Sequence, residues 1–493
     1  MPENTHVDWS REIMPGERKP RRGDVLVVDL VGFDAKGRAL GTCGEFRVEL
    51  RGGVPGARVR AEVTKRRGQR IRARLIEVLE PSPREVAARC EHFGTCGGCS
   101  LQAMDYDAQL EHLREQVVAA FAAEGMQSLD VLPVLPCAEP WAYRNKMDFT
   151  FGTRRWVEVG EAGDKPRDFA LGLHVGGLYR KVVDIDACPI QFTGGDGILA
   201  DVRRLCLEAG LEPWDVVEHT GLLRHVVLRK GQATGEVMVF LVTAQAAADV
   251  IDPLVTELVR LHPEIRTVVQ GIHERPAAIA TGDEYRVLFG DGFIHERLGG
   301  LTFRLSAASF FQTNTAQAEC LFEIVRAEAQ LSGDEHVLDL YCGTGVISLL
   351  LAGEARAVTG LEIVAEAVTD ARQAALANGI ENVTFHAGDV LAALDEPGLP
   401  SSDVIVVDPP RAGLHPKVIP AILAHAPRRV VYVSCNPKSA ARDAARFAEG
   451  GYRPGPIRPV DLFPHTPHVE CVLSLLPAAV DGEKSLPLET SWG

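Results

Sequence analysis

The chain lacks long apolar runs and has few aromatic residues. Only 6% of its 493 residues are Phe, Trp or Tyr, and apolar runs such as 346–352 are far too short to span a bilayer. Residues 1–14 are polar and contain no apolar segment of the kind that a secretory signal needs. We therefore expect a cytoplasmic protein with no membrane partner. In that reducing compartment, eleven cysteines predict metal binding or catalysis rather than a disulfide framework.

The chain has fewer basic than acidic residues overall, but one segment has an excess of basic residues. The formal net charge is −15, which by itself disfavours a nucleic-acid partner. Residues 15–75, however, contain 16 Lys and Arg and 7 Asp and Glu, a local charge of +9 that leaves −24 for the rest of the chain. A local basic surface matters more for phosphate contact than the charge of the whole chain. This segment therefore indicates RNA binding, with a merely solvated basic face as the alternative.

The chain is long enough for several domains. Between residues 23 and 80, short alternating segments separated by Gly-rich turns predict a small β-barrel of the oligonucleotide-binding type. Mixed strand and helix patterns follow, and from Leu301 strands and helices alternate as in a doubly wound, Rossmann-like α/β domain. The expected order is a flexible tail (1–22), the barrel (23–80), a central α+β domain (81–300), the α/β domain (301–478) and a second tail (479–493).

A glycine turn follows the first strand of the expected α/β domain. Residues 337–340 have the pattern of a buried strand, which runs into Gly343 and Gly345, where a helix begins. Glu362 ends the next expected strand 19 residues beyond Gly343, a spacing that suits a carboxylate bonded to ribose hydroxyls. The third glycine of a dinucleotide motif is missing, and Asp389 follows the third strand. The pattern favours S-adenosylmethionine over a dinucleotide, with plain strand–helix packing as the alternative.

Three further strand ends carry polar groups. Asp408 and Arg411 lie in a Pro-stiffened turn after one apolar run. Cys435 comes between a second run and Asn-Pro, and Glu470 precedes a third. A lone thiol at a strand end usually packs as a small hydrophobe. A thiol accompanied by carboxylates and an arginine indicates instead a nucleophile with its base.

These groups suit methylation of a pyrimidine carbon. An exocyclic amine can be methylated without a thiol, whereas C5 of a pyrimidine becomes nucleophilic only after a thiolate has added to C6. A base must then remove the C5 proton before the thiolate leaves. Cys435 and Glu470 fit these two roles, Asp408 could bond the cofactor or the base edge, and Arg411 could stabilise negative charge. The target base would have to be unstacked to reach them.

Three motifs carry a resemblance to a known family. Asp-Pro-Pro-Arg (408–411), Ser-Cys-Asn-Pro (434–437) and the ten residues 461–470 resemble the signature of the RNA 5-methyluridine (uracil-C5) methyltransferases. The resemblance extends from the N-terminal barrel, which is similar to a TRAM domain, to about Leu475. It implies that Cys435 is the nucleophile that forms an adduct with C6 and that Glu470 removes the C5 proton.

The resemblance also implies where the methyl donor is bound. The implied contacts to S-adenosylmethionine come from Gln312, Tyr341, Glu362, Asp408 and Asp389, beside the backbone of Gly343 and Gly345. Many members carry Asn where this chain has Val346. A side-chain contact to the cofactor is therefore not expected at Val346, although a backbone contact is.

Three cysteines, Cys90, Cys96 and Cys99, lie close together in the sequence, and Cys188, which precedes a proline, is the candidate for a fourth ligand. Four thiolates suit either a zinc ion or an iron–sulfur cluster. The family resemblance favours a 4Fe–4S cluster over zinc, in a structural role, since the expected reaction moves no net electrons. The remaining cysteines are expected to pack as small apolar residues: Cys43, Cys137, Cys206, Cys320, Cys342 and Cys471.

The expected function is methylation of uridine C5 in structured RNA by a monomer. A barrel together with a cysteine cluster resembles the ribosomal-RNA branch of the family, acting on 23S rRNA, more than the short transfer-RNA branch. The alternatives are the same chemistry on tRNA and a non-catalytic RNA-binding iron–sulfur protein. The segment around Trp141 and Arg144 has a pattern of base stacking and phosphate contact, with a packed core aromatic as its alternative.

Overall fold

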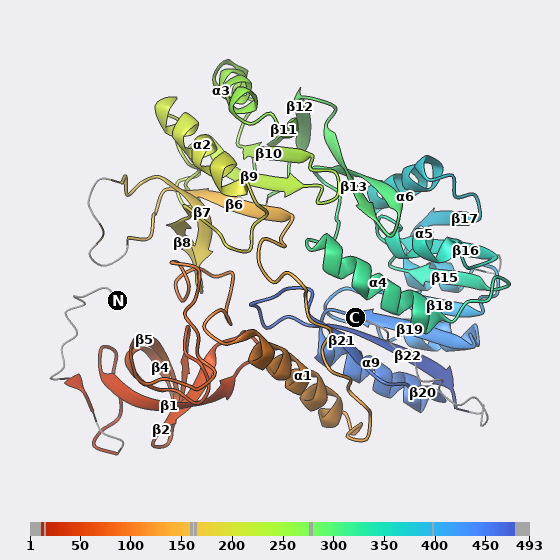
Figure 1. Cartoon of the computed structure of the whole chain (residues 1–493), viewed down its shortest axis with the longest axis horizontal. Coiled ribbons are helices and arrows are strands. Elements are labelled where there is room, and N and C mark those ends of the chain that lie inside the picture. The colour runs from red at the N-terminus through yellow and green to blue at the C-terminus, as the bar shows by residue number, and fades with distance from the viewer. Residues whose placement is uncertain are drawn as a thin grey trace. The chain divides into compact units, whose positions relative to one another are not determined.

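The computed structural model describes residues 11–13, 16–157, 161, 165–275, 280–396 and 399–478 (Figure 1). They pack into two compact units. Unit 1 holds the described residues up to Leu113, those of Pro136–Glu319 and Asp461–His468, and unit 2 holds Arg114–Leu135, the described residues of Cys320–Val460 and those from Val469 onward. The expected second tail lies outside the described residues, as does most of the first.

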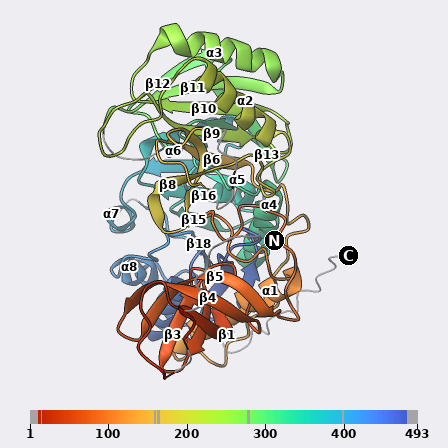
Figure 2. The ribbon, with the colours of Figure 1, turned by 90° about the vertical axis from the view of Figure 1, so that its left-hand side faces the viewer.

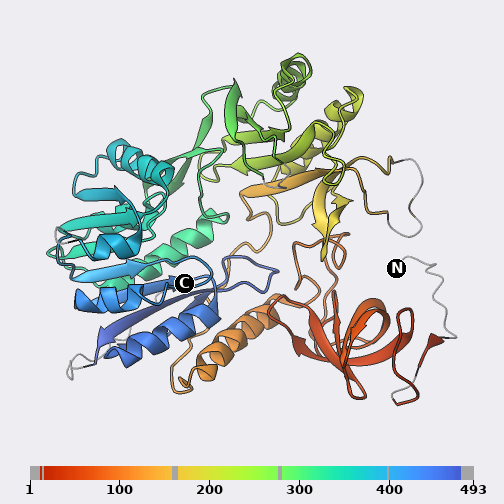
Figure 3. The same ribbon diagram turned by 180° about the vertical axis from the view of Figure 1, so that it is seen from behind.

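Unit 1 begins with a closed barrel, which confirms the barrel expected from the sequence. Its strands are β1 (Val25–Phe33), β2 (Ala39–Cys43), β3 (Phe46–Leu50), β4 (Arg58–Arg67) and β5 (Arg70–Glu80), joined in the order β1-β2-β3-β5-β4. The red and orange ribbon of these strands curls back on itself in Figure 3. Val28, Val48, Val59 and Ile71 are fully buried in its core. The short β2, which contains a glycine, was not expected from the sequence.

Two described residues before β1, Ile13 and Arg18, contact the barrel. Ile13 is 5% exposed within the barrel core, and its N–H donates to the carbonyl of Val25 at 3.1 Å. Arg18 forms an ion pair with Asp24 at 2.5 Å. The expectation of a flexible tail as far as Arg22 is therefore wrong for these residues, because an apolar side chain and a buried carboxylate hold them against β1.

A seven-stranded sheet forms the centre of unit 1, in the order β12-β11-β10-β9-β6-β7-β8. The strands are β6 (Lys146–Gly152), β7 (Ala170–Val175), β8 (Leu178–Asp184), β9 (Leu223–Lys230), β10 (Val237–Thr243), β11 (Ile265–Ile272) and β12 (Glu284–Phe289). Helices α2 (Gly195–Glu208) and α3 (Ala248–Leu261) lie side by side and pack their apolar residues on the sheet (Figures 1 and 2). The hairpin β13 (Phe293–Leu298) and β14 (Leu301–Ser306) follows.

Unit 2 contains an eight-stranded sheet, which confirms the doubly wound α/β domain. Its strands are β15 (His336–Leu340), β16 (Ala357–Glu362), β17 (Val383–Ala387), β18 (Val404–Val407), β19 (Arg429–Ser434), β20 (Tyr452–Pro454), β21 (Arg458–Val460) and β22 (Glu470–Pro477). The first five are parallel, in the order β17-β16-β15-β18-β19. β22 pairs antiparallel with β19, and β20 and β21 pair antiparallel with β22.

Helices connect the parallel strands. They are α5 (Val346–Ala352), α6 (Ala365–Ala377), α7 (Val390–Leu394), α8 (Val418–Ala424) and α9 (Pro437–Glu449), while α1 (Tyr106–Ala123) and α4 (Thr315–Ala329) each have residues in both units. Over the described residues, the chain forms no helix that is both long and apolar enough to cross a membrane.

The strand order places a switch point beside β15. From β15 the chain proceeds to β16 and β17 on one side, and then returns to β18 and β19 on the other. In open sheets of this kind, ligands bind at the carboxyl ends of the strands beside the switch point. The turns that follow β15, β16, β18 and β19 are therefore the places where functional groups are expected.

Candidate active site

Three strand ends meet at one edge of the unit 2 sheet. β18 and β19 are parallel neighbours, and Asp408 and Cys435 follow their carboxyl ends. β22 runs antiparallel to β19, with Cys471 opposite Ser434. Cys435 follows Ser434 and Glu470 precedes Cys471, and the Glu470 carboxylate adds to the rise in the pKa of the Cys435 thiol, so the two side chains lie near each other. The sheet therefore gathers the thiol and both carboxylates that the sequence singled out.

Glu470 is a buried acid. It is 5% exposed, and desolvation raises the pKa of its carboxyl to about 8, with Asp408 adding to the rise and the Arg411 guanidinium opposing it. A carboxyl group whose pKa lies near neutral pH can both accept and release a proton during a reaction cycle. The surroundings of Glu470 therefore suit a general base.

Cys435 is half-buried. Burial raises the pKa of its thiol to about 11, Glu470 and Asp408 add to the rise, and Arg411 opposes it. Desolvation also raises the pKa of Asp408 to about 6. Because Asp408 and Arg411 act on both Cys435 and Glu470, the two proton equilibria are coupled. Among these groups, Arg411 is the one whose charge favours the thiolate.

The turn after β15 contains two glycines whose backbone angles other residues rarely adopt. The φ angle is 54° at Gly343 and 78° at Gly345, both in the left-handed region. A Cβ added to Gly345 would lie 2.7 Å from Phe385 Cζ and 2.9 Å from Ala371 Cβ, so strand–helix packing also requires glycine there. Apart from Gly343 itself and its two chain neighbours, no atom of the described residues lies within 4 Å of a Cβ added to Gly343. Open space for a ligand is therefore found at Gly343 and not at Gly345.

Polar side chains surround this turn. Glu362, at the end of β16, accepts hydrogen bonds from two backbone amides, that of Gly343 among them at 3.1 Å. Asp389 caps the start of α7 through its side chain. Desolvation raises the pKa of Tyr341, and the carboxylates of Asp389 and Glu362 are among the groups that add to the rise. The three side chains predicted to contact a cofactor thus lie near one another, and their contacts with it stay predictions.

Two buried acids were not singled out from the sequence. Asp339, in the middle of β15, is 0% exposed, its pKa is raised to about 7 by burial, and Ser348 Oγ donates to its Oδ2 at 2.6 Å. Asp443, on α9, is also 0% exposed and accepts hydrogen bonds from the Leu414 N–H at 2.7 Å and the Tyr432 hydroxyl at 2.8 Å. The sequence could have pointed to Asp339, because it is an acidic residue inside an otherwise apolar run. The helix pattern around Asp443 carries no comparable signal.

Gln312 belongs to unit 1. Its carbonyl accepts a hydrogen bond from Asn145 Nδ2 at 3.0 Å, and the Asn314 side-chain amide donates to the carbonyl of Leu462 at 3.1 Å. These bonds fix the backbone of the Phe-Gln-Thr-Asn segment within unit 1. The contact of the Gln312 side chain with a cofactor stays a prediction.

The four cysteines predicted to bind a metal lie near one another in unit 1. Burial raises the pKa of Cys99 to about 12, and the thiols of Cys188, Cys96 and Cys90 add to the rise. Burial also raises the pKa of Cys188 to about 11. Yet no group of three or more His, Cys, Asp or Glu side chains in the described ranges is arranged to hold a metal ion. The donor set suits a thiolate-bound metal in its chemistry, but its arrangement here does not form such a site.

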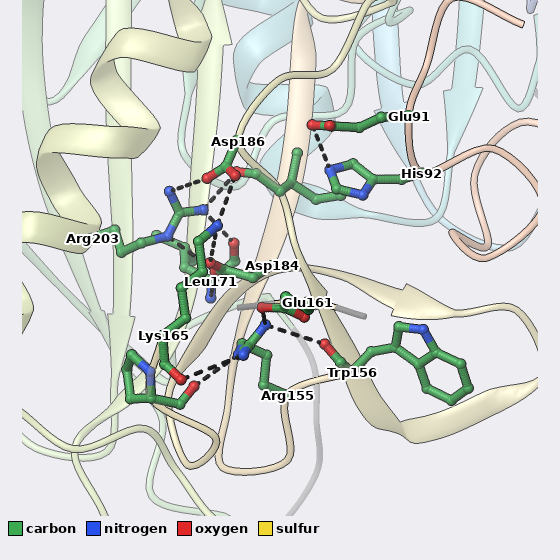
Figure 4. Close-up of polar contacts among 12 residues, drawn as sticks. Glu91, His92, Arg155, Trp156, Glu161, Lys165, Leu171, Asp184, Asp186 and Arg203 are labelled. Carbon is green, nitrogen blue, oxygen red and sulfur yellow. Dashed lines mark hydrogen bonds and ion pairs between the residues drawn. The ribbon is translucent and has the colours of Figure 1, made fainter. Parts of the chain in front are cut away.

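Polar contacts fix the segment that leads to Cys188. Arg203, on α2, donates to Asp184 at 3.0 Å and to Asp186 at 3.4 Å. The same guanidinium donates to the carbonyl of Leu171 at 3.0 Å. Figure 4 shows these contacts converging on the Arg203 side chain. Cys188 therefore follows a segment whose position is set by the sheet and by α2.

Trp141 is engaged in packing within unit 1. Its ring stacks on the imidazole of His465 with centroids 3.8 Å apart and planes 28° apart, and the Arg89 guanidinium carbon lies 4.6 Å from its centroid. Tyr143 is buried and donates its hydroxyl to the carbonyl of Pro464 at 3.1 Å. The structure therefore supports the packing alternative for this segment over the predicted stacking of an RNA base.

Comparison with known proteins gives this geometry a context. A family model described as a methyltransferase domain matches residues 331–449. An uncharacterized RNA methyltransferase of Chlorobaculum tepidum is 38% identical over 468 residues, which cover 92% of this chain and 97% of that protein. An uncharacterized RNA methyltransferase of Caldanaerobacter subterraneus is also 38% identical, over 454 residues that cover 92% of this chain and 98% of that protein.

A solved structure is similar over nearly the whole chain. The tRNA (uracil-54, C5)-methyltransferase of Pyrococcus abyssi, in complex with S-adenosyl-L-homocysteine, aligns with a TM-score of 0.73 at 28% identity. The alignment covers 91% of this chain and 100% of that one. The similarity thus includes the barrel and the central sheet as well as the α/β domain.

Proposed function

The chain belongs to the family of RNA methyltransferases, and on that premise we propose that it transfers a methyl group from S-adenosylmethionine to C5 of a uridine in RNA. The observation that carries the proposal lies at the edge where β19 and β22 pair: Ser434 is opposite Cys471, Cys435 and Glu470 are the next residues, and the buried Glu470 carboxylate adds to the raised pKa of the Cys435 thiol. The motifs around these two residues resemble those of the uracil-C5 methyltransferases. The P. abyssi enzyme, whose fold this chain shares, is named for that reaction.

In the proposed reaction, Cys435 adds to C6 of the uracil ring as a thiolate. The addition makes C5 an enolate carbon, which is nucleophilic enough to accept the methyl group. Because the pKa of the thiol is raised to about 11, the thiol must first give its proton to solvent water, and the sulfur then attacks as the thiolate. Arg411 favours this step because its positive charge opposes the rise.

Glu470 completes the proposed cycle. After methylation, C5 carries both the new methyl group and its original proton, and the C6–sulfur bond can break only when that proton is removed. The Glu470 carboxylate takes the proton, and the electron pair left on C5 expels the Cys435 thiolate. The carboxyl must be ionised at that moment, although its pKa is raised to about 8.

We propose that the turns after β15, β16, β17 and β18 hold the methyl donor. S-adenosylmethionine, when bound, supplies an electrophilic methyl group. The side chains of Tyr341, Glu362, Asp389 and Asp408 and the open backbone at Gly343 would contact it, with Gln312 of unit 1 as a further contact. Support comes from the switch point of the sheet and from the match of residues 331–449 to a methyltransferase domain.

Two RNA classes are candidates for the substrate. The barrel and the cysteine cluster favour ribosomal RNA, because this combination resembles the ribosomal branch of the family. The likeness to an enzyme named for uracil-54 of tRNA favours tRNA. Mass-spectrometric mapping of 5-methyluridine in rRNA and tRNA from a strain without the gene distinguishes them, since the modification should vanish at one site in one class.

The covalent step can be tested with RNA that contains 5-fluorouridine. Fluorine at C5 cannot leave as a proton does, so the adduct between Cys435 and C6 should persist through denaturation and appear as a slower band on a gel. Cys435→Ala should form no adduct and should lose at least about 10³-fold in methylation rate. Retained methylation by Cys435→Ala would exclude the covalent mechanism.

We also propose that Cys90, Cys96, Cys99 and Cys188 are the ligands of a 4Fe–4S cluster, as the family resemblance implies, in preference to zinc. Support comes from the mutual effect of the four thiols on the pKa of Cys99. Because they do not form a metal site as arranged here, binding would require the thiols to move. Protein purified without oxygen should be brown and contain iron and acid-labile sulfide, and Cys99→Ser should reduce both. A colourless sample that contains zinc would refute the cluster.

A further inference from the structure

The turn that carries Asp408 and Arg411 is tied to the start of α9 by hydrogen bonds that the proposed chemistry does not require. Asn436, the residue after the Cys435 thiol, donates its side-chain amide to the carbonyl of Arg411 at 2.9 Å. Ser439 Oγ donates to the same carbonyl at 3.3 Å. The loop that holds the thiol and the turn that holds the arginine are therefore joined directly.

Asp443 lies at the centre of this attachment. Its Oδ2 accepts the Leu414 N–H at 2.7 Å and the Tyr432 hydroxyl at 2.8 Å. Its Oδ1 lies 3.3 Å from Arg442 Nε, and Arg442 Nη2 donates to the carbonyl of Ala412 at 2.6 Å. One buried carboxylate thus links strand β19, helix α9 and the turn that follows β18.

The turn approaches α9 so closely that position 413 accepts only glycine. Gly413 has a φ of 84°, and a Cβ added to it would lie 2.5 Å from Arg442 Nη2, 2.5 Å from Asp443 Oδ2 and 2.9 Å from Ser439 Cβ. A buried carboxylate is destabilised unless its hydrogen bonds and ion pairs are complete. Tyr432 of β19 and the Arg442 and Arg446 side chains of α9 supply part of them. The bond from Leu414 is made only while the turn stays against the helix. Turn and carboxylate therefore hold each other in place.

We propose that Asp443 is a positioning residue for the Cys435 thiol, which it serves by fixing the turn from Asp408 to Leu414 and with it the Arg411 guanidinium. The inference rests on the proposed role of Cys435 as the nucleophile. Arg411 acts on the sulfur through its charge, and that effect weakens as the distance grows and as water enters. A turn released from α9 would therefore leave the thiolate less stabilised, although its own residues are unchanged.

The test is the pH dependence of Cys435 alkylation, followed by mass spectrometry of the peptide that contains it. Asp443→Asn should raise the pKa of Cys435 by about one unit, which leaves a roughly tenfold smaller thiolate fraction at neutral pH. The kcat for methylation should fall by a similar factor, while KM for S-adenosylmethionine changes by less than about twofold. Tyr432→Phe removes one bond and keeps the ring, so a smaller shift in the same direction is expected. Glu449→Gln changes an exposed acid at the end of the same helix and should alter neither quantity.

A second measurement checks the route through Arg411. If Asp443 acts through that guanidinium, adding Asp443→Asn to Arg411→Ala should slow alkylation no further than Arg411→Ala alone. Additive losses, or an unchanged alkylation profile in both Asp443→Asn and Tyr432→Phe at wild-type Tm, would overturn the proposal. Alkylation needs neither RNA nor methyl donor. A failure of the proposed uridine methylation would therefore be recognised separately.

Discussion

Two equally buried acids, one in each unit, have opposite surroundings. Asp24, beside the barrel, is 1% exposed, and its carboxylate accepts hydrogen bonds from Arg18 at 2.5 Å and from the Arg21 N–H at 2.7 Å, which lower its pKa. Glu470 in unit 2 is 5% exposed, and burial raises its pKa to about 8, with a further contribution from the Asp408 carboxylate. Desolvation acts on both carboxyl groups. At Asp24 the bonds and charges of its basic neighbours outweigh it, whereas at Glu470 desolvation is the largest cause and Arg411 only partly opposes it.

Two further acids of the barrel, Glu49 and Asp34, also lie against arginine side chains. Glu49, 7% exposed, lies 2.8 Å from Arg38, 2.5 Å from Arg70 and 3.8 Å from Arg72. Arg38 also forms an ion pair with Asp34, whose pKa is lowered. A carboxyl whose pKa is lowered, such as that of Asp34, stays ionised at neutral pH, whereas acids with raised pKa values are candidates for proton transfer. This difference in pKa distinguishes the acids of the barrel from those of the candidate active site.

The largest expected effect comes from Glu470→Gln. The amide cannot accept the C5 proton, so kcat should fall by about 10²- to 10⁴-fold, and the covalent RNA adduct should accumulate because the thiolate cannot leave. Single-turnover kinetics and a denaturing gel measure both. Asp24→Asn is the matched control in the other unit and should accumulate no adduct. A loss of activity in Glu470→Gln without adduct would assign the base to another residue.

The pH dependence of the methyl-transfer cycle should reflect the raised pKa of Glu470. Its carboxyl must be ionised to remove the C5 proton, and the Cys435 thiol, whose pKa is raised to about 11, must also lose its proton. The single-turnover rate should therefore rise with pH more steeply below pH 8 than above it, where only ionisation of Cys435 still adds to the rate. A rate that is flat between pH 6 and pH 9 would contradict this assignment. In Glu470→Gln, the change of slope near pH 8 should be absent.

Stability should respond to pH in opposite ways at the two acids. The folded-state pKa of Asp24 is lowered, so its stabilising contribution is present above its ordinary pKa and is lost as the pH falls through the lowered value. The folded-state pKa of Glu470 is raised, so its contribution is present below its ordinary pKa and is lost as the pH rises through about 8. Urea denaturation should show Asp24→Ala to be less stable by about 1–3 kcal/mol at pH 7 and to differ less at acidic pH. Glu470→Gln should lose less stability than the wild type between pH 6 and pH 9.

The smallest effect is expected at the barrel surface. Arg72→Gln should weaken RNA binding only a few-fold and reduce the slope of log affinity against log salt by about one, because one phosphate contact is removed. Filter binding at several salt concentrations measures this, with single-turnover methylation at saturating RNA expected to be unchanged. An unaltered salt slope would assign the basic face of the barrel to solvation.

Apolar patterning was sufficient where strands are buried on both faces. The expected segments for β15, β16, β18 and β19 match the structure closely, because a central strand of a parallel sheet is a continuous apolar run. The sequence did not reveal β7, β8 or β12, which lie toward the edges of the unit 1 sheet. The burial pattern of β8 shows why, since its first four residues are exposed. A strand at the edge of a sheet shows no regular pattern of apolar residues in the sequence when solvent covers a face that would otherwise pack against protein.

The candidate site was accessible from sequence because its motifs are local turns. A thiol before Asn-Pro and an acid before Pro-Pro-Arg place reactive groups at strand ends wherever the strands lie. The same local reasoning left the segment of Trp141 open between RNA stacking and core packing, because its partners Arg89 and His465 are distant in sequence. It also passed over Asp443, whose role depends on a turn about thirty residues earlier.

The sequence by itself determined which groups lie at the strand ends, namely one thiol with carboxylates, together with a glycine turn and a basic N-terminal segment. Only the tertiary structure decided that the Cys435 thiol lies near Glu470, that the pKa values of Asp24 and Glu470 move in opposite directions, and that Asp443 is bonded to the turn after β18. The physical reason is that desolvation and Coulomb interactions depend on distances in space. Those distances are set by strand pairing between segments that are far apart along the chain.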